Sequence, residues 1–195
     1  MRTMILLAAA LLLQACNTHP NRQALNAFLK ANSQAQAMEQ VAPEFQLNVL
    51  STDGSTRTLN RAQLEDAIAW DLATNTQFRY ERLLVDDSKA TGFFSEESDF
   101  YRLLDTNGWL AQLTFHFNDQ SRIRSIDYVP LSEQKDLADT MSAFVNWALT
   151  ERPAELGAVY PDGQIVRSGE SAQRWIALLQ DWRAATGRPT IELNM

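Results

Sequence analysis

The sequence predicts an α+β fold, in which a curved antiparallel sheet is wrapped on N-terminal helices and a helical segment extends from its C-terminal side. Three observations lead to this prediction. Two amphipathic helical stripes with a short strand between them come first, several adjacent hairpin patterns follow as far as Pro130, and two more helical stripes occupy the rest of the chain. The 195 residues, 45% of them hydrophobic, suffice for one packed domain with an appendage.

The first element ahead of the fold is a signal-peptide pattern. Arg2 precedes an uninterrupted apolar run over residues 5–13. This run is less than half of the roughly 20 apolar residues that a membrane-spanning helix needs. Residues 1–15 are therefore predicted to be a secretion signal and not an anchor helix.

The signal ends in Leu13-Gln14-Ala15-Cys16, which resembles a bacterial lipobox with a less usual residue, Gln14, in its middle. The thiol of a lipobox cysteine accepts a diacylglyceryl group, and cleavage then leaves the cysteine as the new N-terminus. Cys16 is the only cysteine, so it can form no disulfide within the chain. We predict a lipidated Cys16 and a polar tether over residues 16–21. The alternative is that Cys16 is an ordinary small residue after a conventional cleavage site.

A lipidated Cys16 has a consequence for location. Three acyl chains exceed the two signals that stable anchoring takes, so the mature protein should stay on its membrane through the lipid anchor. Asn17 follows the cysteine, where an Asp would signal retention at the inner membrane. We therefore expect the protein at the outer membrane, facing the periplasm.

The soluble part begins with two predicted helices and a strand. Residues 22–40 are strong helix formers with one apolar stripe. Residues 45–50 alternate as a short strand, which the turn sequence at 52–55 closes. Asn60 and a glutamine three residues later are typical of a capped helix start, and this second helix is predicted to end near Thr74.

The segment up to Pro130 alternates with a period of two, which only strands explain. Strands are predicted over residues 78–85, 90–94, 100–104, 109–117 and 122–129. Asn107-Gly108 is the strongest hairpin signal in the chain, so the two strands beside it are expected to pair across a tight turn.

This order of helix, short strand, helix and meander ends in a hairpin with Phe115-His116-Phe117, an Asn-Asp turn and Ile126-Asp127-Tyr128. It resembles the nuclear transport factor 2-like superfamily, which includes SnoaL-like domains, over residues 22–130. The resemblance implies a cone-shaped fold whose curved sheet wraps a helix and leaves an apolar pocket at the open end. It also implies a homodimer, because related domains often pair through their sheets.

Residues 131–195 lie outside that core. Helical stripes at 136–149 and 171–186 predict a helical extension packed on the core. The alternative is a partial second copy of the first half, which the segment at 153–163 would open. The extension holds three of the five tryptophans, Trp147, Trp175 and Trp182. These side chains are expected mainly in the core, and they are also the best candidates for binding a protein partner.

Enzymes of the superfamily that this chain resembles, such as ketosteroid isomerases, place an Asp or a His with a Tyr inside the cone. The apolar surroundings there raise the pKa of the carboxyl group. By that resemblance the catalytic candidates are Asp71, Tyr80, His116 and Asp127. The strand alternation turns His116 and Asp127 outward. Asp71, near a helix end, is expected to be solvated, and Tyr80 is expected at the pocket without an acid or base partner.

Composition excludes several other functions. The net charge is -7 with no basic stripe, which argues against nucleic acid as a partner. The folded part has one histidine, His116, and no cysteine, so no metal site is expected. The chain has no glycine-rich phosphate loop and no nucleophile elbow, so no cofactor is expected.

These observations favour a non-catalytic periplasmic module that binds an apolar ligand or a partner protein, or that serves as a scaffold. The alternative is a small lyase or isomerase that acts in the cone pocket. A buried acid or base within reach of a ligand would separate the two, and the sequence shows none in phase with the apolar face.

Overall fold

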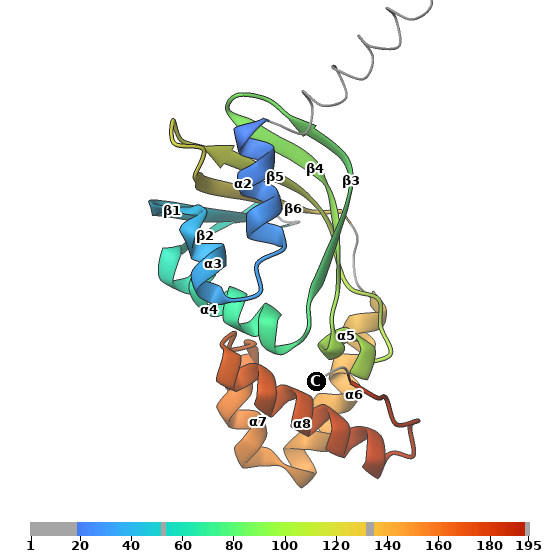
Figure 1. Cartoon of the computed structure of the whole chain (residues 1–195). Coiled ribbons are helices and arrows are strands. Elements are labelled where there is room, and N and C mark those ends of the chain that lie inside the picture. Colours follow the sequence, from blue (N-terminus) through green and yellow to red (C-terminus); the bar gives the residue numbers. More distant parts are fainter. Residues whose placement is uncertain (1–18, 52–53, 132–134, 194–195) are drawn as a thin grey trace, which may run out of the picture.

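The computed structural model describes residues 19–51, 54–131 and 135–193. They form a curved sheet with helices on its concave side and at one end (Figure 1). The helices are α2 (Pro20–Leu29), α3 (Gln34–Glu39), α4 (Arg61–Ala73), α5 (Asp99–Leu103), α6 (Lys135–Glu151), α7 (Pro153–Val159), the 3-10 turn η1 (Pro161–Gly163) and α8 (Gly169–Ala185). The strands are β1 (Val41–Leu50), β2 (Thr56–Asn60), β3 (Gln77–Val85), β4 (Lys89–Glu97), β5 (Leu110–Phe117) and β6 (Ile123–Pro130). The predicted signal peptide and Cys16 lie outside the described residues.

The six strands make one sheet in the order β2-β1-β6-β5-β4-β3. Strands β3 to β6 form an antiparallel meander. Strand β1 pairs antiparallel with β2 and parallel with β6, so the sheet is mixed at that side. The predicted α+β class, with a curved sheet on N-terminal helices and a helical C-terminal extension, is confirmed.

A bulge in β3 helps to curve the sheet. The pairing of β3 with β4 shifts register between Glu81 and Leu84, and Arg82 adopts a φ of 52°. A bulge of this kind bends its strand and increases the local twist. On β4, Gly92 faces this region, where a Cβ atom would stand 3.3 Å from the carbonyl oxygen of Glu81. The strands can therefore bend around the helices, as Figure 1 shows.

Several local predictions differ from the structure. The predicted helix over residues 22–40 is two helices, because Ser33 caps α3 by accepting a hydrogen bond from the backbone of Gln36. Strand β2 was not predicted. The predicted strand over residues 100–104 is helix α5, so β4 and β5 are not joined by a tight turn at Asn107-Gly108.

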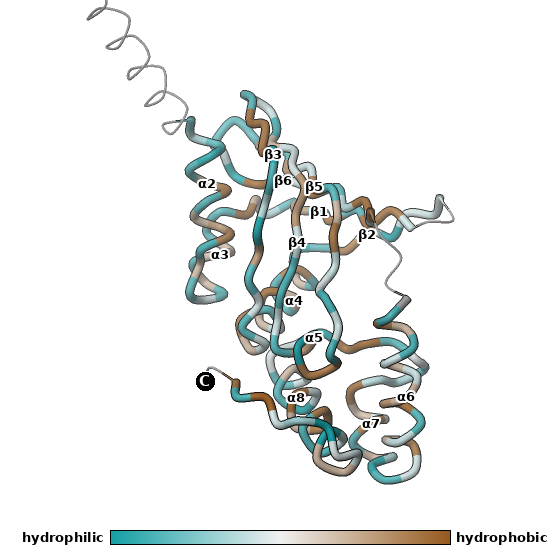
Figure 2. Tube along the Cα trace, turned by 90° about the vertical axis from the view of Figure 1, so that its right-hand side faces the viewer, coloured by the Kyte–Doolittle hydropathy of each residue, from teal (hydrophilic) through white to brown (hydrophobic). Residues whose placement is uncertain are grey.

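The C-terminal helices pack at one end of the curved sheet, beside α5. Figure 2 shows α6, α7 and α8 beside α5, away from the side that α2 and α3 cover. Their apolar residues join Trp70 of α4 and Phe100 of α5 in one buried cluster. Trp175 and Trp182 are 0% and 2% exposed. A partner-binding role for these two tryptophans is therefore wrong, because no partner could reach them, whereas Trp147 is only partly buried.

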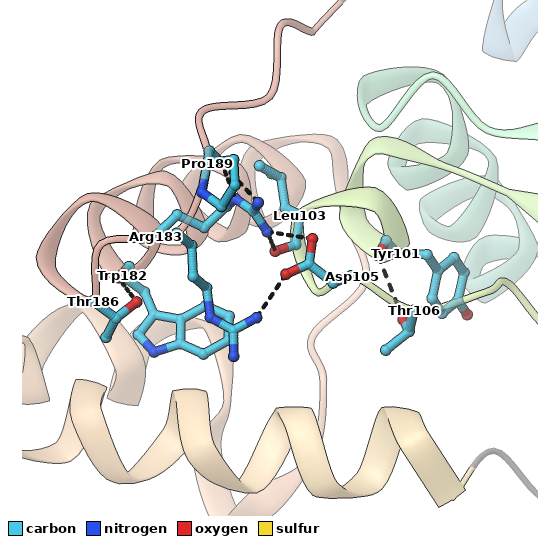
Figure 3. Close-up of polar contacts among 9 residues, drawn as sticks. Tyr101, Leu103, Asp105, Thr106, Trp182, Arg183, Thr186 and Pro189 are labelled. Carbon is cyan, nitrogen blue, oxygen red and sulfur yellow. Dashed lines mark hydrogen bonds and ion pairs between the residues drawn. The ribbon is translucent and has the colours of Figure 1, made fainter.

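Arg183 of α8 connects the extension to the sheet domain through hydrogen bonds (Figure 3). It is buried although it is charged, with 4% of the residue exposed. Its guanidinium group donates hydrogen bonds to the carbonyl oxygen of Leu103 (2.8 Å), to Oδ1 of Asp105 (2.8 Å) and to the carbonyl oxygen of Pro189 (2.7 Å). Arg188 pairs with the other oxygen of Asp105 and lies 4.2 Å from the centre of the Trp182 ring. The described part of the extension is helical and contains no strand, so it does not repeat the sheet.

Among the described residues, no helix combines the length and the apolar character needed to cross a membrane.

Candidate binding cavity

A cavity of about 920 Å³ lies between the concave face of the sheet, the N-terminal helices and the C-terminal extension. This volume is in the range of small-molecule sites in proteins. Most of the lining is apolar or aromatic, and it includes Phe28, Leu64, Trp70, Phe78, Phe100, Trp109, Leu113, Phe115 and Ile126.

The C-terminal extension completes the wall of the cavity. Leu137 and Met141 of α6 line it, as do Tyr160, Ile165 and Arg167 from the segment between α7 and α8. The sequence predicts the extension as a segment outside the core, and no pattern in it indicates that it closes the cavity. The extension therefore contributes to the site as well as to the packing.

Two carboxyl groups, those of Asp71 and Glu96, lie in this wall. Asp71 is in the last turn of α4, which begins at the predicted cap: Asn60 and Gln63 form a reciprocal capping box. Glu96 is near the end of β4, where every second residue from Ala90 onward is buried. Glu96 continues this inward series, so its carboxyl group faces the cavity.

The sequence does not predict Glu96 as a site residue. The polar run at residues 95–98 is typical of a turn, so the strand was predicted to end at Phe94, whereas β4 extends through Glu97. The spacing of Glu96 in the sequence could have indicated its position, because it lies an even number of residues from Ala90 and Phe94. Residues spaced in this way share one face of a strand. The expectation of no acid in phase with the apolar face is therefore wrong.

Gly108 lets the chain pass close to Glu96. A Cβ atom at Gly108 would stand 1.4 Å from the carbonyl oxygen of Glu96. The next residue, Trp109, accepts a hydrogen bond of 3.1 Å from the backbone nitrogen of Glu96. Gly108 is therefore required by close packing against β4.

Burial sets the protonation of the two carboxyl groups. It raises the pKa of Asp71 to about 7, against the opposing effects of Arg167 and of a hydrogen bond from Thr76. Burial and the charge of Asp71 together raise the pKa of Glu96 to about 8, again against Arg167. The two groups therefore change between their protonated and ionised forms near neutral pH, whereas ordinary surface carboxyl groups do so only under acidic conditions.

Two phenol groups belong to the same electrostatic cluster. Burial, with the charge of Glu96, raises the pKa of Tyr128 to about 12 and also raises that of Tyr101. Both hydroxyl groups therefore stay protonated at physiological pH. Tyr101 comes from α5 and Tyr128 from β6, so four elements bring Asp71, Glu96 and these two hydroxyl groups to one region of the cavity.

The carboxylate of Glu96 has no partner among the residues that the structure describes. Its side chain accepts no hydrogen bond and forms no ion pair there, and the whole residue is 4% exposed. Its oxygens are not among the buried atoms that lack a partner, so they are accessible from the cavity, where a bound group can reach them.

His116 and Asp127 lie on the opposite face of the sheet, as the alternation predicted, and neither lines the cavity. Nε2 of His116 lies 2.8 Å from Oδ2 of Asp127, whose other oxygen accepts a 2.8 Å hydrogen bond from Asn48. Burial opposes ionisation of Asp127, but the hydrogen bonds from Asn48 and His116 outweigh it and lower its pKa. These side chains link three neighbouring strands.

Tyr80 does not line the cavity, so the expectation that it would is wrong. It lies on β3, the edge strand beside α2, where its hydroxyl group is 3.4 Å from Oδ1 of Asn26. Its ring packs 5.7 Å from that of Phe94. Of the four catalytic candidates, only Asp71 is in the cavity.

In the described part of the chain, no group of three or more His, Cys, Asp and Glu side chains could hold a metal ion.

Comparison with protein-family models and with curated protein sequences gives no match. Among solved structures, the chain is similar to an uncharacterized bacterial protein with a cystatin-like fold from Silicibacter pomeroyi. That match has 15% identity and a TM-score of 0.46, and it covers 71% of this chain and 96% of the other. A steroid delta-isomerase from Pseudomonas aeruginosa gives 14% identity, a TM-score of 0.45, and coverage of 67% and 94%. A nuclear transport factor 2-like protein of unknown function from Cytophaga hutchinsonii has 10% identity and a TM-score of 0.43, and the match covers 57% of this chain and 89% of the other.

Proposed function

We propose that the protein binds a small, largely apolar molecule in the cone cavity, with the polar end of that molecule at Asp71 and Glu96. The cavity carries this proposal: it has a volume of about 920 Å³, a mostly apolar and aromatic lining, and acidic side chains in one region. Sites for small molecules typically combine such a lining with a few polar groups that fix the orientation of the ligand.

Filling the cavity should abolish this binding. Ala67 of α4 lines the cavity, so the indole ring in Ala67→Trp would occupy space that the ligand needs. We expect the affinity for 1-N-phenylnaphthylamine, a neutral apolar fluorophore, to fall at least about tenfold, which corresponds to roughly 1.4 kcal/mol. Titration of the fluorophore, followed by its emission, measures the change.

Ala62→Trp is the matched control. Ala62 is on the same helix but is exposed and does not line the cavity. It should leave the affinity unchanged. Equal affinities for both variants and the wild type would place the fluorophore outside the cavity and contradict the proposed function.

A second candidate function, proton transfer in the cavity by a small lyase or isomerase, is supported by one observation. The raised pKa values of Asp71 and Glu96 lie near neutral pH, where a general acid or base is most effective. A bound ligand whose C–H hydrogen exchanges with deuterium in heavy water, with the exchange lost in Asp71→Asn, would favour this function. Binding without exchange favours the non-catalytic module.

We also propose that the protein acts while anchored by lipid at the outer membrane, facing the periplasm. The lipobox-like sequence that ends at Cys16 supports this location. Cells fed a palmitate analogue should label the wild type, and Cys16→Ala should lose the label and leave the membrane fraction. A Cys16→Ala protein that keeps the label or stays with membranes would contradict the anchor.

A further inference from the structure

The charges along the cavity wall do not balance. Three carboxyl groups line it, those of Asp66, Asp71 and Glu96, against two guanidinium groups, those of Arg57 and Arg167. Arg167 is the cation that acts on Asp71 and Glu96 together, and its side chain is exposed. With both acids ionised, the acidic end of the cavity lacks one positive charge.

The missing positive charge would lie beside the carboxylate of Glu96. Glu96 is 4% exposed, lines the cavity, and has no partner for its carboxylate among the described residues. The titratable groups that act on it are Asp71 from α4, Tyr101 from α5, Tyr128 from β6, and Arg167 from the segment before α8. Apart from Arg167, these groups are acidic or neutral.

Aromatic rings surround the same end. Trp109 and Tyr128 pack edge to face with their centres 5.1 Å apart, and Trp70 packs with Phe100 at 5.5 Å. All four side chains line the cavity. The faces of such rings attract cations, most strongly when water is excluded, and aromatic cages of this composition bind quaternary ammonium groups.

We infer that the acidic end of the cavity binds an ammonium head group and that the apolar remainder holds the hydrocarbon part of the same cationic amphiphile. This inference rests on the proposed function. An anionic head group would meet two acidic groups against one arginine, and a neutral one would leave Glu96 protonated and gain nothing from its negative charge. An ammonium group supplies the missing charge and takes the place of the proton that Glu96 otherwise keeps.

Competition between ligands of equal chain length tests this inference. Decyltrimethylammonium, decanol and decanoate would each displace 1-N-phenylnaphthylamine from the full-length protein. At about pH 8.5, where both carboxyl groups are largely ionised, the cation should displace it at roughly tenfold lower concentration than decanol. At about pH 5.5, where both are protonated, this preference should disappear. Decanoate should be the weakest competitor at about pH 8.5.

Three variants test whether Glu96 causes the preference for the cation over decanol. Glu96→Gln should lose the preference for decyltrimethylammonium over decanol at about pH 8.5. Glu97→Gln, at the exposed neighbour that pairs with Arg79, should keep it. Arg167→Gln removes the competing cation from an exposed position, so it should strengthen binding of decyltrimethylammonium, an increase that loss of structure would not produce.

The outcomes separate the inference from the proposed function. Displacement by decanol and decyltrimethylammonium at equal concentrations, at both pH values, overturns the ammonium site and leaves the apolar cavity as the binding site. Failure of the protein to bind the fluorophore at all overturns both. Isothermal titration in two buffers of different ionisation enthalpy adds a direct readout, since binding of the cation near neutral pH should release a proton.

Discussion

Glu96→Gln is expected to make the protein more stable at about pH 8 and to leave its stability near pH 4 unchanged. The reason is the difference in pKa between the unfolded chain, where Glu96 has its ordinary value of 4.5, and the folded protein, where burial raises it to about 8. Between these values the unfolded chain has lost the proton that the folded protein keeps. The wild type therefore loses stability as the pH rises.

The size of this effect follows from the shift. One pKa unit corresponds to about 1.4 kcal/mol, and Asp71 shares part of the shift, so we expect Glu96→Gln to gain on the order of 3 kcal/mol at the alkaline end. For a domain of this size that is roughly 5 to 10 °C in melting temperature. Thermal unfolding followed by circular dichroism, at several pH values between these limits, measures it.

Glu97→Gln is the matched control, because Glu97 is the next residue of β4 and is exposed. Its unfolding temperature should follow the wild type at every pH. If Glu96→Gln also followed the wild type throughout, Glu96 would be ionised in water-like surroundings, and the ammonium site would lose its physical basis.

The features that the sequence predicted well depend on local pattern. The apolar series on β5, with Leu113 and Phe115, placed His116 on the outer face, because residues two apart in a strand share a face. The cap at Asn60 required only a partner three residues away, and the capping box is present. Such signals are contained within one element, so they can be read without knowing the fold.

The features that were missed depend on contacts between distant segments. Phe100 and Tyr101 have side chains that favour strands, yet they lie in α5, where they are buried against the C-terminal extension. The position of Asp71 at a helix end suggested solvent, but the cavity wall is completed by Arg167 and its neighbours much later in the chain. No local pattern shows which later segment will cover a side chain.

Arg183→Met is expected to destabilise the protein by about 1 to 3 kcal/mol, the usual cost of leaving a buried acceptor, here the carbonyl oxygen of Leu103, without its donor. The methionine fills similar volume but donates no hydrogen bond. It would leave the carbonyl oxygens of Leu103 and Pro189 without this donor, and Asp105 would keep only Arg188. Partial burial opposes ionisation of Asp105, but the hydrogen bonds from both arginines outweigh it and lower its pKa, so part of this network should also be lost in acid.

Arg174→Met separates this effect from the general loss of an arginine. Arg174 is on the same helix, α8, but it is exposed and pairs with Glu170 one turn away. Surface pairs of this kind contribute about 0.5 kcal/mol or less, so the melting temperature should barely change. Chemical denaturation of both variants measures the two free energies of unfolding. Equal and small losses would mean that the apolar cluster around Trp175 and Trp182 holds the extension to the sheet domain without Arg183. A large loss in Arg183→Met alone, with weaker binding of the fluorophore, would show that the arginine fixes the extension whose residues close the cavity.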